Sequence, residues 1–378
     1  MLPLDFGINT FIVTENTAKM KMMTPTPGDI KKIIDYAVWA PSGDNSQPWR
    51  FEIVNNEVRV FNVPERDTSL YNYNYNASLV ALGGLIENIK IVSSHFGYTA
   101  LINISPSTVN SNLITTISLT KGNLSENSLF PFIKGRISNR KPYDIRALSK
   151  KHKEEILQVG KVSSDISIKL VDDREQIEKL ATAASINEKV VLENKKLHEF
   201  LFRHITWSEA EDARKKGFFI KTLELKGPQA VAFKLLSHWK ILVLLNKIGV
   251  SDLVSRENAK VYKRSGAFVA IIANNSSPAS FLASGMLMQR FWLSATKVGL
   301  GVQPLTGVLF LCHRIKSGID HELHPFHSTL VTNAYSTAEN IFKTDGKPIT
   351  MMFRVGYAKI PSAKCLRREP DVRFLQQT

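Results

Sequence analysis

Residues 77–98, ASLVALGGLIENIKIVSSHFGY, align without a gap with residues 279–300, ASFLASGMLMQRFWLSATKVGL. Identical pairs include Ala77/Ala279, Ser78/Ser280, Ala81/Ala283, Gly83/Gly285 and Gly97/Gly299. Both stretches are mostly apolar and end near a glycine, which can adopt the left-handed conformation that closes a helix. Each is therefore predicted to be a long buried helix, and the pair indicates an internal duplication. Because glycine-capped helices are common, a chance match is the alternative.

The segments around these helices follow a matching order. Upstream, DIKKIIDYA (29–37) resembles QIEKLATAA (176–184) in its helical spacing of apolar residues. Strands are predicted at RFEIV (50–54), EVRVFNV (57–63), LINIS (101–105) and LITTISL (113–119), then at ISIKLV (166–171), AFVAIIA (267–273), GVQPLTGVLF (301–310) and MMFRVGYA (351–358). This pattern predicts an α+β protein with two related halves, residues 1–130 and 131–378. The boundary falls near the polar stretch TKGNLSENSLFPFIKG.

Three motifs occur in only one place each. The loop APSGDNSQPW (40–49) follows the first helix of half one, whereas the matching chain of half two continues as helix. RISNRKPYD (136–144) opens half two, and KCLRREPDVRF (364–374) closes it, with no counterparts in half one. Each half lacks what the other has. A single site assembled between the halves, with the second copy lost, would explain this asymmetry.

Composition limits the class of protein. The chain has 378 residues, of which 43% are hydrophobic and 22% charged, as in ordinary globular proteins. Only two cysteines occur, which fits a reducing compartment better than a disulfide scaffold. The N-terminus MLPLDFGINTFIV lacks the basic region and cleavage pattern of a signal peptide, so we expect a cytoplasmic protein.

The longest apolar segment, residues 230–250, is interrupted by three lysines and a histidine. These charges exclude a membrane-spanning helix and leave a buried or an interfacial helix. The net charge of +15 is compatible with a nucleic acid, an anionic surface or an anionic cofactor as partner. Because the basic residues are scattered and no nucleic-acid-binding motif accompanies them, a solvated basic surface is the simplest interpretation.

Two pairs of arginines suit an anion. Arg136 and Arg140 flank Ser138, and Arg367 and Arg368 lie near the C-terminus. Guanidinium groups form bidentate, charge-assisted hydrogen bonds with phosphate, and a dianion often takes such pairs from separate segments. Either pair alone would more simply be an ordinary surface cluster.

The loop at residues 40–49 suits a flat polar ring. Pro41 ends the helix, Gly43 lets the backbone turn, and Ser42, Asn45 and Ser46 offer short polar groups without bulk. Such a loop can place its main chain against a ring and contact the ring's edge. An ordinary helix-to-strand turn is the alternative.

The remaining motifs point to a cofactor rather than to side-chain catalysis. VQPLTGVLF (302–310) is predicted as a strand interrupted by Pro304 and Gly307, a pattern that marks close approach of backbone to a ligand. The histidines lack metal-ligand spacing, and no nucleophile elbow, P-loop or dinucleotide fingerprint occurs. An enzyme without catalytic groups of its own usually relies on a cofactor.

These segments resemble a known family. APSGDNSQPWRF is similar to the A-P-S-x-x-N-S-Q-P-W segment of the flavin-dependent nitroreductase superfamily. RISNR resembles that family's R-x-S-x-R phosphate segment, and RVGYAKIPSAKCLRREP resembles its closing Gly-Tyr with basic residues. The chain looks most like the tandem, Acg-like subgroup of NAD(P)H nitroreductases, and the match covers nearly the whole chain.

The resemblance implies a fold and a chemistry. Family members are usually homodimers with two FMN sites at the interface, so the tandem chain is expected to be a nitroreductase-like, three-layer α-β-α pseudo-dimer with one surviving site. FMN would be the cofactor, NADH or NADPH the electron donor, and a nitroaromatic, a quinone or a similar small molecule the acceptor. No metal and no catalytic side chain is implied, because the flavin carries the chemistry. We expect a monomer that acts as a pseudo-dimer, and further oligomerisation is left open.

The resemblance also assigns residues. For the phosphate and ribityl chain it implies Arg136, Ser138, Arg140, Arg367 and Arg368; for the flavin contacts from half one, Pro41, Ser42, Gly43 and Asn45. Leu305, Thr306 and Gly307 match the segment whose backbone amide usually faces the reactive flavin N5. A glutamate is common in that segment, and its replacement here by Leu305 or Thr306 leaves the hydride donor and substrate range open.

Residues 187–254 have no counterpart in simple family members. The insertion is helical, basic and apolar in pattern, and a helix pair around Trp239 has no evident partner in its own half. It is predicted to form a lid over the flavin, with a peripheral hairpin as the equal alternative.

Three functional hypotheses follow. The first is the flavin oxidoreductase, and the second is a protein that binds or sequesters FMN with little turnover. The third is a basic nucleic-acid-binding or membrane-surface protein. Under the first hypothesis the partner is a small acceptor, with no nucleic acid and no membrane span.

Overall fold

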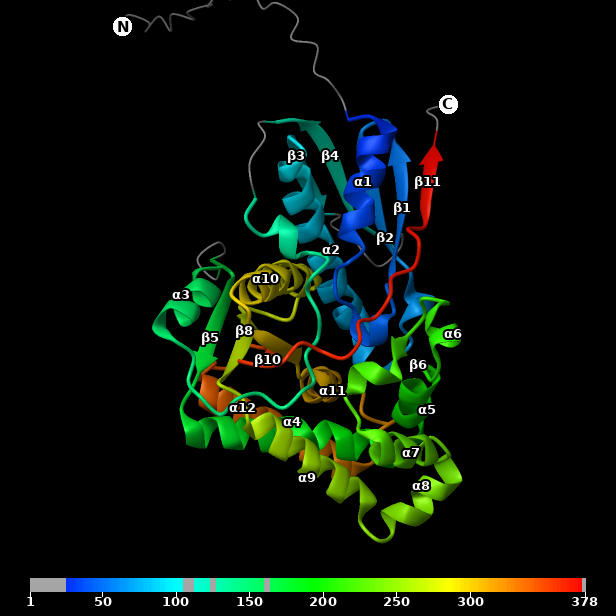
Figure 1. Cartoon of the computed structure of the whole chain (residues 1–378), viewed down its shortest axis with the longest axis vertical. Coiled ribbons are helices and arrows are strands. Elements are labelled where there is room, and N and C mark those ends of the chain that lie inside the picture. The colour runs from blue at the N-terminus through cyan, green and yellow to red at the C-terminus, as the bar shows by residue number, and fades with distance from the viewer. Residues whose placement is uncertain (1–24, 105–111, 123–126, 160–163, 376–378) are drawn as a thin grey trace, which may run out of the picture.

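The computed structural model describes residues 25–104, 112–122, 127–159 and 164–375 (Figure 1). The N-terminal stretch examined for a signal peptide and part of the predicted boundary between the halves, residues 123–126, lie outside these ranges. Helices and strands alternate along the chain, which confirms the predicted α+β class.

The first sheet belongs mainly to half one. Its strands are β1 (Trp49–Val54), β2 (Glu57–Asn62), β3 (Tyr98–Ile104), β4 (Leu113–Lys121) and the C-terminal β11 (Val372–Leu375), in the order β11-β1-β2-β4-β3. Strand β11 runs parallel to β1, so the end of the chain returns to half one. Helices α1 (Pro27–Ala37) and α2 (Asn76–His95) share a core with the buried alternate residues of these strands.

The second sheet has helices on both faces. Its strands β5 (Ile166–Val171), β8 (Ala267–Ala273), β9 (Gly301–Pro304) and β10 (Ile349–Gly356) follow the order β5-β8-β10-β9. Alternate residues of β8 enter two cores: Val269 and Ile271 pack with α10 (Pro278–Lys297), and Phe268 and Ala270 pack on the opposite side. That opposite side carries α4 (Arg174–Glu193), α11 (Gly307–Lys316) and α12 (Pro325–Phe342), whereas α3 (Lys150–Gln158) packs on α10.

The two sheets share a topology. Within β1-β2-β4-β3 and within β5-β8-β10-β9, every neighbouring pair is antiparallel. In each sheet the order along the sheet is first, second, fourth and third, and a long central helix connects the second strand to the third. One difference is that α1 precedes its first strand whereas α4 follows it. The shared order supports the duplication that we propose from the sequence.

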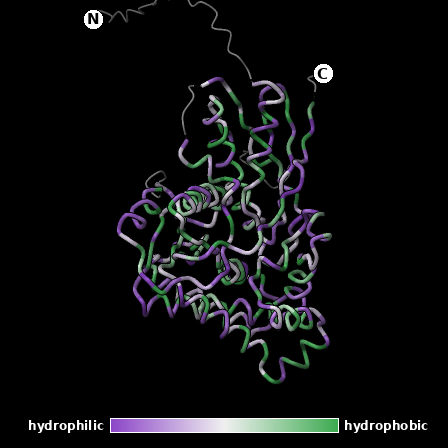
Figure 2. Tube along the Cα trace, in the orientation of Figure 1, coloured by the Kyte–Doolittle hydropathy of each residue, from purple (hydrophilic) through white to green (hydrophobic). Residues whose placement is uncertain are grey.

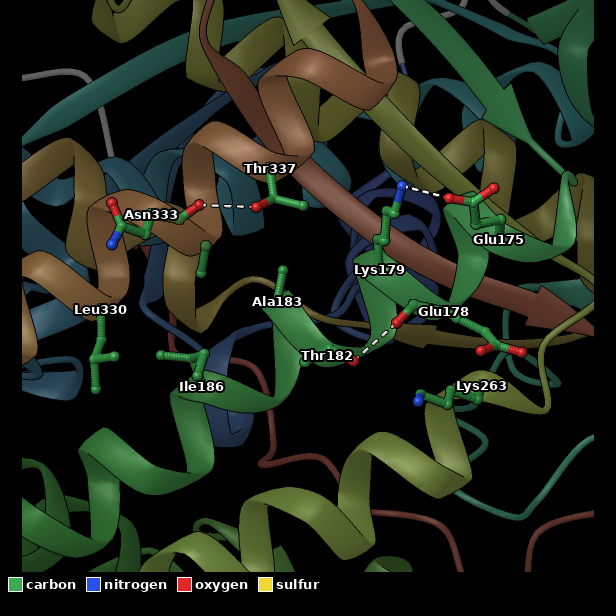
Figure 3. Close-up of a pocket in the computed structure, with 11 residues that line it drawn as sticks. Glu175, Glu178, Lys179, Thr182, Ala183, Ile186, Lys263, Leu330, Asn333 and Thr337 are labelled. Atoms are coloured by element: carbon green, nitrogen blue, oxygen red, sulfur yellow. Dashed lines mark hydrogen bonds and ion pairs between the residues drawn. The ribbon is translucent and has the colours of Figure 1, made fainter.

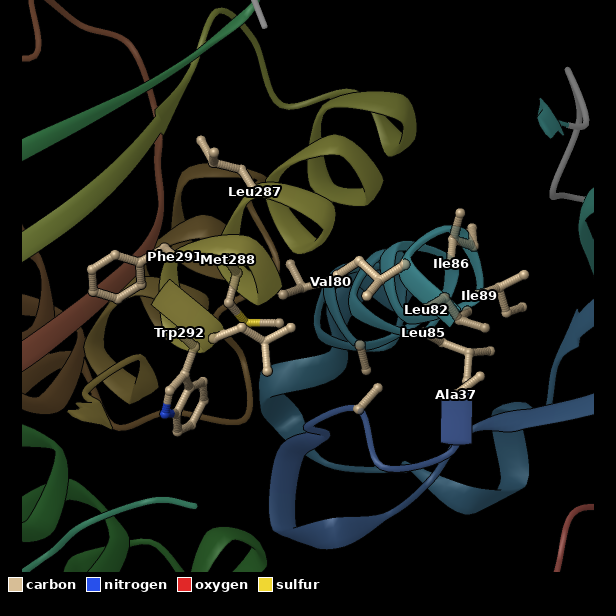
Figure 4. Close-up of a cluster of buried hydrophobic side chains, with 14 of the residues drawn as sticks. Ala37, Val80, Leu82, Leu85, Ile86, Ile89, Leu287, Met288, Phe291 and Trp292 are labelled. Carbon is tan, nitrogen blue, oxygen red and sulfur yellow. The ribbon is translucent and has the colours of Figure 1, made fainter. Parts of the chain in front are cut away.

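The two central helices, α2 and α10, pack against each other at the middle of the molecule (Figure 4). A Cβ on Gly83 would lie 2.0 Å from the Leu282 carbonyl oxygen, and a Cβ on Gly285 would lie 2.0 Å from the Val80 carbonyl oxygen. Since Gly83 aligns with Gly285 and Val80 with Leu282, these contacts are equivalent by exchange of the halves. Reciprocal contacts of this kind are the signature of a two-fold interface.

Polar contacts between α2 and α10 also occur in pairs that are related by exchanging the two halves. The buried Glu87 carboxylate pairs with Arg290, and Gln289 donates to Asn88 at 2.7 Å. In the gapless alignment Glu87 corresponds to Gln289 and Asn88 to Arg290. The second pair is therefore the first pair with its halves exchanged, and only the Glu87–Arg290 pair is charged.

The prediction for GVQPLTGVLF is wrong in its second part. Strand β9 ends at Pro304, and helix α11 begins at Gly307. Beyond Gly307 the apolar residues recur at helical spacing, because Val308, Leu309, Leu311 and Cys312 all face the core. The interruption by Pro304 and Gly307 is thus a strand-to-helix junction.

The insertion at residues 187–254 is largely helical, as predicted. It contains α5 (Lys195–Arg203), β6 (Ile205–Thr206), α6 (Glu209–Asp212), β7 (Phe218–Phe219), α7 (Gly227–Leu236) and α8 (Trp239–Asn246), and it runs from within α4 into α9 (Val250–Lys263). Its apolar side chains form a small separate core that includes Phe202, Phe218, Leu236 and Leu242.

This small core favours the peripheral hairpin, the equal alternative to the lid, for α7 and α8. Helices α7 and α8 have a partner within the insertion, so their inner faces are already buried and need no flavin to cover. The insertion contacts the loop at residues 40–47 through Lys215 and Gly217. These two residues lie in residues 204–224, which we call the covering segment.

In the part of the chain that the structure describes, one helical stretch, Leu70–His95, is long and apolar enough to cross a membrane by length and composition. Its most apolar window is 83% buried inside the fold, because it contains α2 at the crossing with α10. Its hydrophobicity is therefore that of a core helix.

Candidate functional site

The loop after α1 has a constrained backbone. Asp44, Asn45 and Gln47 have φ angles of 45°, 57° and 53°, which side chains other than glycine seldom adopt. The Ser42 hydroxyl accepts a hydrogen bond from the Gln47 amide at 3.0 Å and closes the turn. Such a backbone persists only where its surroundings fix it.

The side chain of Asn45 ties the loop to two distant segments. Its Nδ2 donates to the Gly217 carbonyl at 2.7 Å and to the Leu366 carbonyl at 3.0 Å. Its Oδ1 accepts a hydrogen bond from Nη1 of Arg367 at 2.8 Å. Since both donors and the oxygen have protein partners, we assign Asn45 the role of positioning Arg367, while its predicted flavin contact stays a prediction.

Gln47 makes a second set of ties. Its Nε2 donates to the Lys215 carbonyl at 3.2 Å, and its Oε1 accepts a hydrogen bond from the Arg368 amide at 2.8 Å. The loop, the covering segment and the C-terminal segment are therefore linked at two neighbouring residues.

Three cations gather beside this loop around Trp39. Lys364 Nζ lies 4.2 Å from the centre of the Trp39 ring, and the Arg367 guanidinium lies 5.6 Å from it. Nη2 of Arg136 donates to the Trp39 carbonyl at 3.3 Å, and its guanidinium lies 4.4 Å from the ring centre of Trp292 on α10. We call Arg136, Lys364 and Arg367 the basic cluster. Its members come from two of the three single-copy motifs.

Within the described residues, no carboxylate neutralises the basic cluster. The Nε atoms of Arg136 and Arg367 are buried without a hydrogen-bond partner. Burial and the charge of Arg367 lower the pKa of Arg136 to about 9. Burial and both arginines lower the pKa of Lys364 to about 8. Unpaired buried charge is costly, and a phosphate group would supply the missing acceptors.

Arg140 lies apart from the basic cluster. Its Nη1 donates to the Thr222 carbonyl of the covering segment at 3.3 Å. Its positive charge favours the ionised forms of Asp44 in the loop and of Tyr262. Arg140 therefore belongs to a second region, which we call the polar end of the site.

The start of α11 also lies at the polar end. The hydroxyl of Tyr71 donates to Oδ1 of Asn187 at 2.8 Å, and a Cβ on Gly307 would come within 1.9 Å of that oxygen. Thr306, the residue that precedes α11, makes no side-chain capping bond. The start of α11 therefore lacks a capping side chain from the residue that precedes it.

Two carboxyl groups near the polar end have raised pKa values. Burial and the neighbouring Asp67 raise the pKa of Asp44 to about 6, and burial raises the pKa of Glu188 to about 7. Oε1 of Glu188 accepts a hydrogen bond from Tyr262 at 2.7 Å, and its Oε2 is buried without a partner. Burial raises the pKa of the Tyr71 hydroxyl, and the charges of Asp44 and Glu188 raise this pKa further. Both carboxyl groups therefore lose their protons at a higher pH than an ordinary carboxyl group does.

The raised pKa of Glu188 predicts a pH-dependent stability. Between pH 4.5 and about 7 the folded state binds the proton more tightly than the unfolded state, so ionisation costs stability as pH rises through this window. Glu188→Gln keeps the acceptor for Tyr262 and removes the ionisation. The variant is expected to gain on the order of 3 kcal/mol over the wild type above pH 7, and to match it near pH 4. Urea unfolding of the flavin-free protein across this range measures the difference. Glu178→Gln, an exposed change on the same helix, is the control, and curves for Glu188→Gln that run parallel to the wild type would contradict the prediction.

The predicted site residues are divided between these regions. Arg136 and Arg367 lie in the basic cluster, whereas Arg368 contributes its backbone amide to Gln47. Ser138 forms an isolated bridge with Val302 of β9. The other predicted residues form the loop (Pro41, Ser42, Gly43, Asn45) or the junction before α11 (Leu305, Thr306, Gly307).

Sequence reasoning missed several neighbours of these residues. Lys364 lies in the C-terminal motif, and Trp39 directly precedes the loop, so both had a signal by position. Tyr71, Asn187 and Glu188 had none, because only the fold brings Tyr71 and α4 to the start of α11.

A separate pocket of about 540 Å³ lies between α4, α12 and the end of α9 (Figure 3). Lys179 there pairs with Glu175 at 2.6 Å, and the Thr182 and Thr337 hydroxyls bond to carbonyls of their own helices. None of the predicted site residues lines it. Because these polar groups have partners nearby, the pocket does not compete with the loop as a candidate site.

Comparison with known proteins gives distant similarities. No protein-family model matches the chain. The chain is 22% identical over 336 residues to Uncharacterized protein MT1398 of Mycobacterium tuberculosis. The aligned region covers 88% of this chain and 46% of that protein. The chain thus spans about half the length of this curated relative.

Among solved structures, the chain is similar to flavin-dependent nitroreductases and oxidoreductases. The FMN-dependent nitroreductase NfnB of Mycobacterium smegmatis, in complex with NADPH, is 13% identical, with 61% of this chain and 88% of that chain covered and a TM-score of 0.35. The NADPH:FMN oxidoreductase of Vibrio harveyi, complexed with NAD+, is 12% identical, with 64% and 73% covered and a TM-score of 0.32. At TM-scores this low, these similarities alone carry no argument about this chain.

Proposed function

We propose that this chain is an FMN-dependent oxidoreductase that transfers hydride from NADH or NADPH through the flavin to a small acceptor such as a nitroaromatic or a quinone. The observation that carries the proposal is the basic cluster, where buried cations without a carboxylate adjoin a loop that resembles a flavin-binding segment. FMN is also named for the solved proteins above, but the proposal depends on the site itself.

The residues fit FMN in two parts. Arg136, Arg367 and Lys364 would hold the phosphate, because Nε of each arginine is buried without a partner and Lys364 adds a third positive charge beside them. Arg140 and the backbone at Pro41–Gly43 and Thr306–Gly307 would contact the ring. When bound, the flavin would supply the redox chemistry by accepting hydride and passing electrons on. The protein's own task is to orient the ring and restrict water, and the covering segment closes one side of the loop.

The second candidate is a protein that sequesters FMN with little turnover. The covering segment favours it, since four side chains of the site region, Asn45, Gln47, Arg140 and Lys141, bond to residues 215–224. A closed site would hold a flavin while limiting access to an acceptor.

We also propose the organisation expected from the sequence. Residues 1–130 and 131–378 are taken as the two related halves, with the insertion at 187–254. The chain would act as a monomeric pseudo-dimer in the cytoplasm. Only one site is proposed, because each of the three motifs that form it occurs once.

Purified protein is therefore expected to contain close to one FMN per chain and to lose its yellow absorbance when NADPH or NADH is added without oxygen. The flavin is released by heat and quantified against the protein. A ratio near two, or no flavin from cells supplied with riboflavin, would contradict the single-site proposal. Bound flavin that dithionite bleaches but neither nucleotide bleaches would favour sequestration.

A further inference from the structure

The hairpin formed by α7 and α8, residues 226–248, has an unusual surface. Sixteen large apolar side chains are exposed within the described residues, and seven of them lie between positions 231 and 253. They are Val231, Leu235, Ile241, Val243, Leu244, Ile248 and Leu253. In Figure 2 this hairpin, at the lower edge of the molecule, is coloured mainly as hydrophobic. Such clustering on an outer surface marks an interaction site.

The exposed positions form a face distinct from the buried one. On α7, Val231 and Leu235 are four residues apart, and on α8 and just beyond it, Ile241, Leu244 and Ile248 follow at three and four. Positions at this spacing share one face of a helix. Leu236 and Leu242 point instead into the small core of the insertion. Val231 is 73% exposed and Ile248 is 79% exposed, so neither side chain contributes to that core.

Positive charge accompanies this apolar face. Residues 225–251 contain four exposed lysines, Lys226, Lys234, Lys240 and Lys247, and no aspartate or glutamate. None of these lysines forms an ion pair with a described residue. The nearest acids along the chain, Glu224 and Asp252, already pair with Lys141 and Lys189. The surface is therefore apolar with a rim of unneutralised cations.

We propose that the α7–α8 hairpin docks on the surface of an anionic lipid bilayer, with its exposed apolar side chains among the headgroups and its lysines on the lipid phosphates. An apolar face bordered by lysines is the composition of helices that lie in the membrane interface. At 10 and 8 residues, α7 and α8 are about 15 and 12 Å long, too short to span a bilayer. The hairpin therefore lies on the membrane rather than crossing it.

Charge distinguishes this partner from a second copy of the chain. In a two-fold contact between copies the same surface meets itself. The four lysines of one copy would then face the four lysines of the other, with no acid on either hairpin to offset the repulsion. Anionic lipid supplies the opposite charge, and each lysine near such a surface adds roughly 1 kcal/mol, or about fivefold in partitioning.

The test is sedimentation of the full chain with vesicles of phosphatidylcholine alone or mixed with phosphatidylglycerol. We expect binding to the mixed vesicles only, weaker as salt rises. Lys240→Ala and Lys247→Ala are each expected to lower partitioning about fivefold. The double change Leu244→Glu with Ile248→Glu is expected to abolish binding. Both side chains are exposed, and thermal unfolding of each variant confirms that the fold is kept.

Ile360→Glu provides the matched control, because Ile360 is 89% exposed and lies outside the hairpin. It is expected to bind vesicles as the wild type does. Equal loss in Ile360→Glu, or full binding by the double variant, would overturn the proposal. So would a failure of the wild type to pellet with mixed vesicles. A dimer in solution that Ile248→Glu dissociates, without vesicle binding, would assign the surface to a second copy instead.

Discussion

Arg136→Met is expected to lower the affinity for FMN by roughly 1.5–3 kcal/mol, or about 10- to 100-fold, while the affinity for riboflavin changes little. Methionine keeps much of the volume that packs on Trp292 but removes the guanidinium. Riboflavin lacks the phosphate that this guanidinium is proposed to bind. Titration of the flavin-free protein with each ligand, followed by fluorescence, measures the two changes separately.

The same substitution is expected to stabilise the flavin-free protein, although it weakens FMN binding. Arg136 is 4% exposed, has no carboxylate partner among the described residues and lies close to Arg367. Removing this unpaired charge is therefore expected to raise the unfolding temperature without flavin. Arg146→Met, an exposed arginine stacked on Tyr357, is the control and should change neither quantity. Equal losses for FMN and riboflavin would show that Arg136 does not meet the phosphate.

Two arginines of the basic cluster could be predicted from the sequence, but the residues that bring the cluster together could not. Arg136 and Arg367 could be predicted because they occur in short motifs with a known chemical use. Their assembly depends on Trp39, whose carbonyl and ring contact the three cations, and on Asn45, which fixes Arg367. A tryptophan before a loop has no periodic signal. The role of Trp39 becomes visible only in the fold, where the C-terminal segment lies beside the loop.

The covering segment could not be predicted for a related reason. Its contacts with the loop use backbone carbonyls of Lys215, Gly217 and Thr222, and a carbonyl is present at every residue. No residue type therefore marks the contact in the sequence. The apolar hairpin around Trp239 was the more visible feature of the predicted insertion at residues 187–254.

Regular elements were predicted far better than junctions. The strands ISIKLV and AFVAIIA have the predicted ends, because each is a short apolar or alternating run bounded by polar residues. The central helices end two residues before Gly97 and Gly299, and both glycines have positive φ, as the sequences indicate. Between Pro304 and Gly307 the chain passes from strand to helix within a mostly apolar stretch, where composition alone does not separate the strand period from the helix period.

The final prediction concerns the crossing of α2 and α10. Gly285→Ala is expected to lower the free energy of unfolding by about 3 kcal/mol or more, at or above the upper end for overpacked cores. The added Cβ would lie 2.0 Å from the Val80 carbonyl oxygen and 2.9 Å from the Val80 Cα, and these backbone atoms are held within a helix. No side-chain rotation can relieve the contact, so the two helices must separate.

Gly83→Ala should cost a similar amount, because its Cβ would meet the Leu282 carbonyl at the same 2.0 Å. Gly227→Ala at the start of α7 is the control, since nothing lies within 4 Å of a Cβ there. Urea unfolding of the three variants compares the costs. Near-neutral values for both central glycines would mean that the helices do not cross this closely. A large cost at one glycine and none at the other would break the exchange symmetry, and with it the proposal that two copies of one ancestral half meet at this crossing.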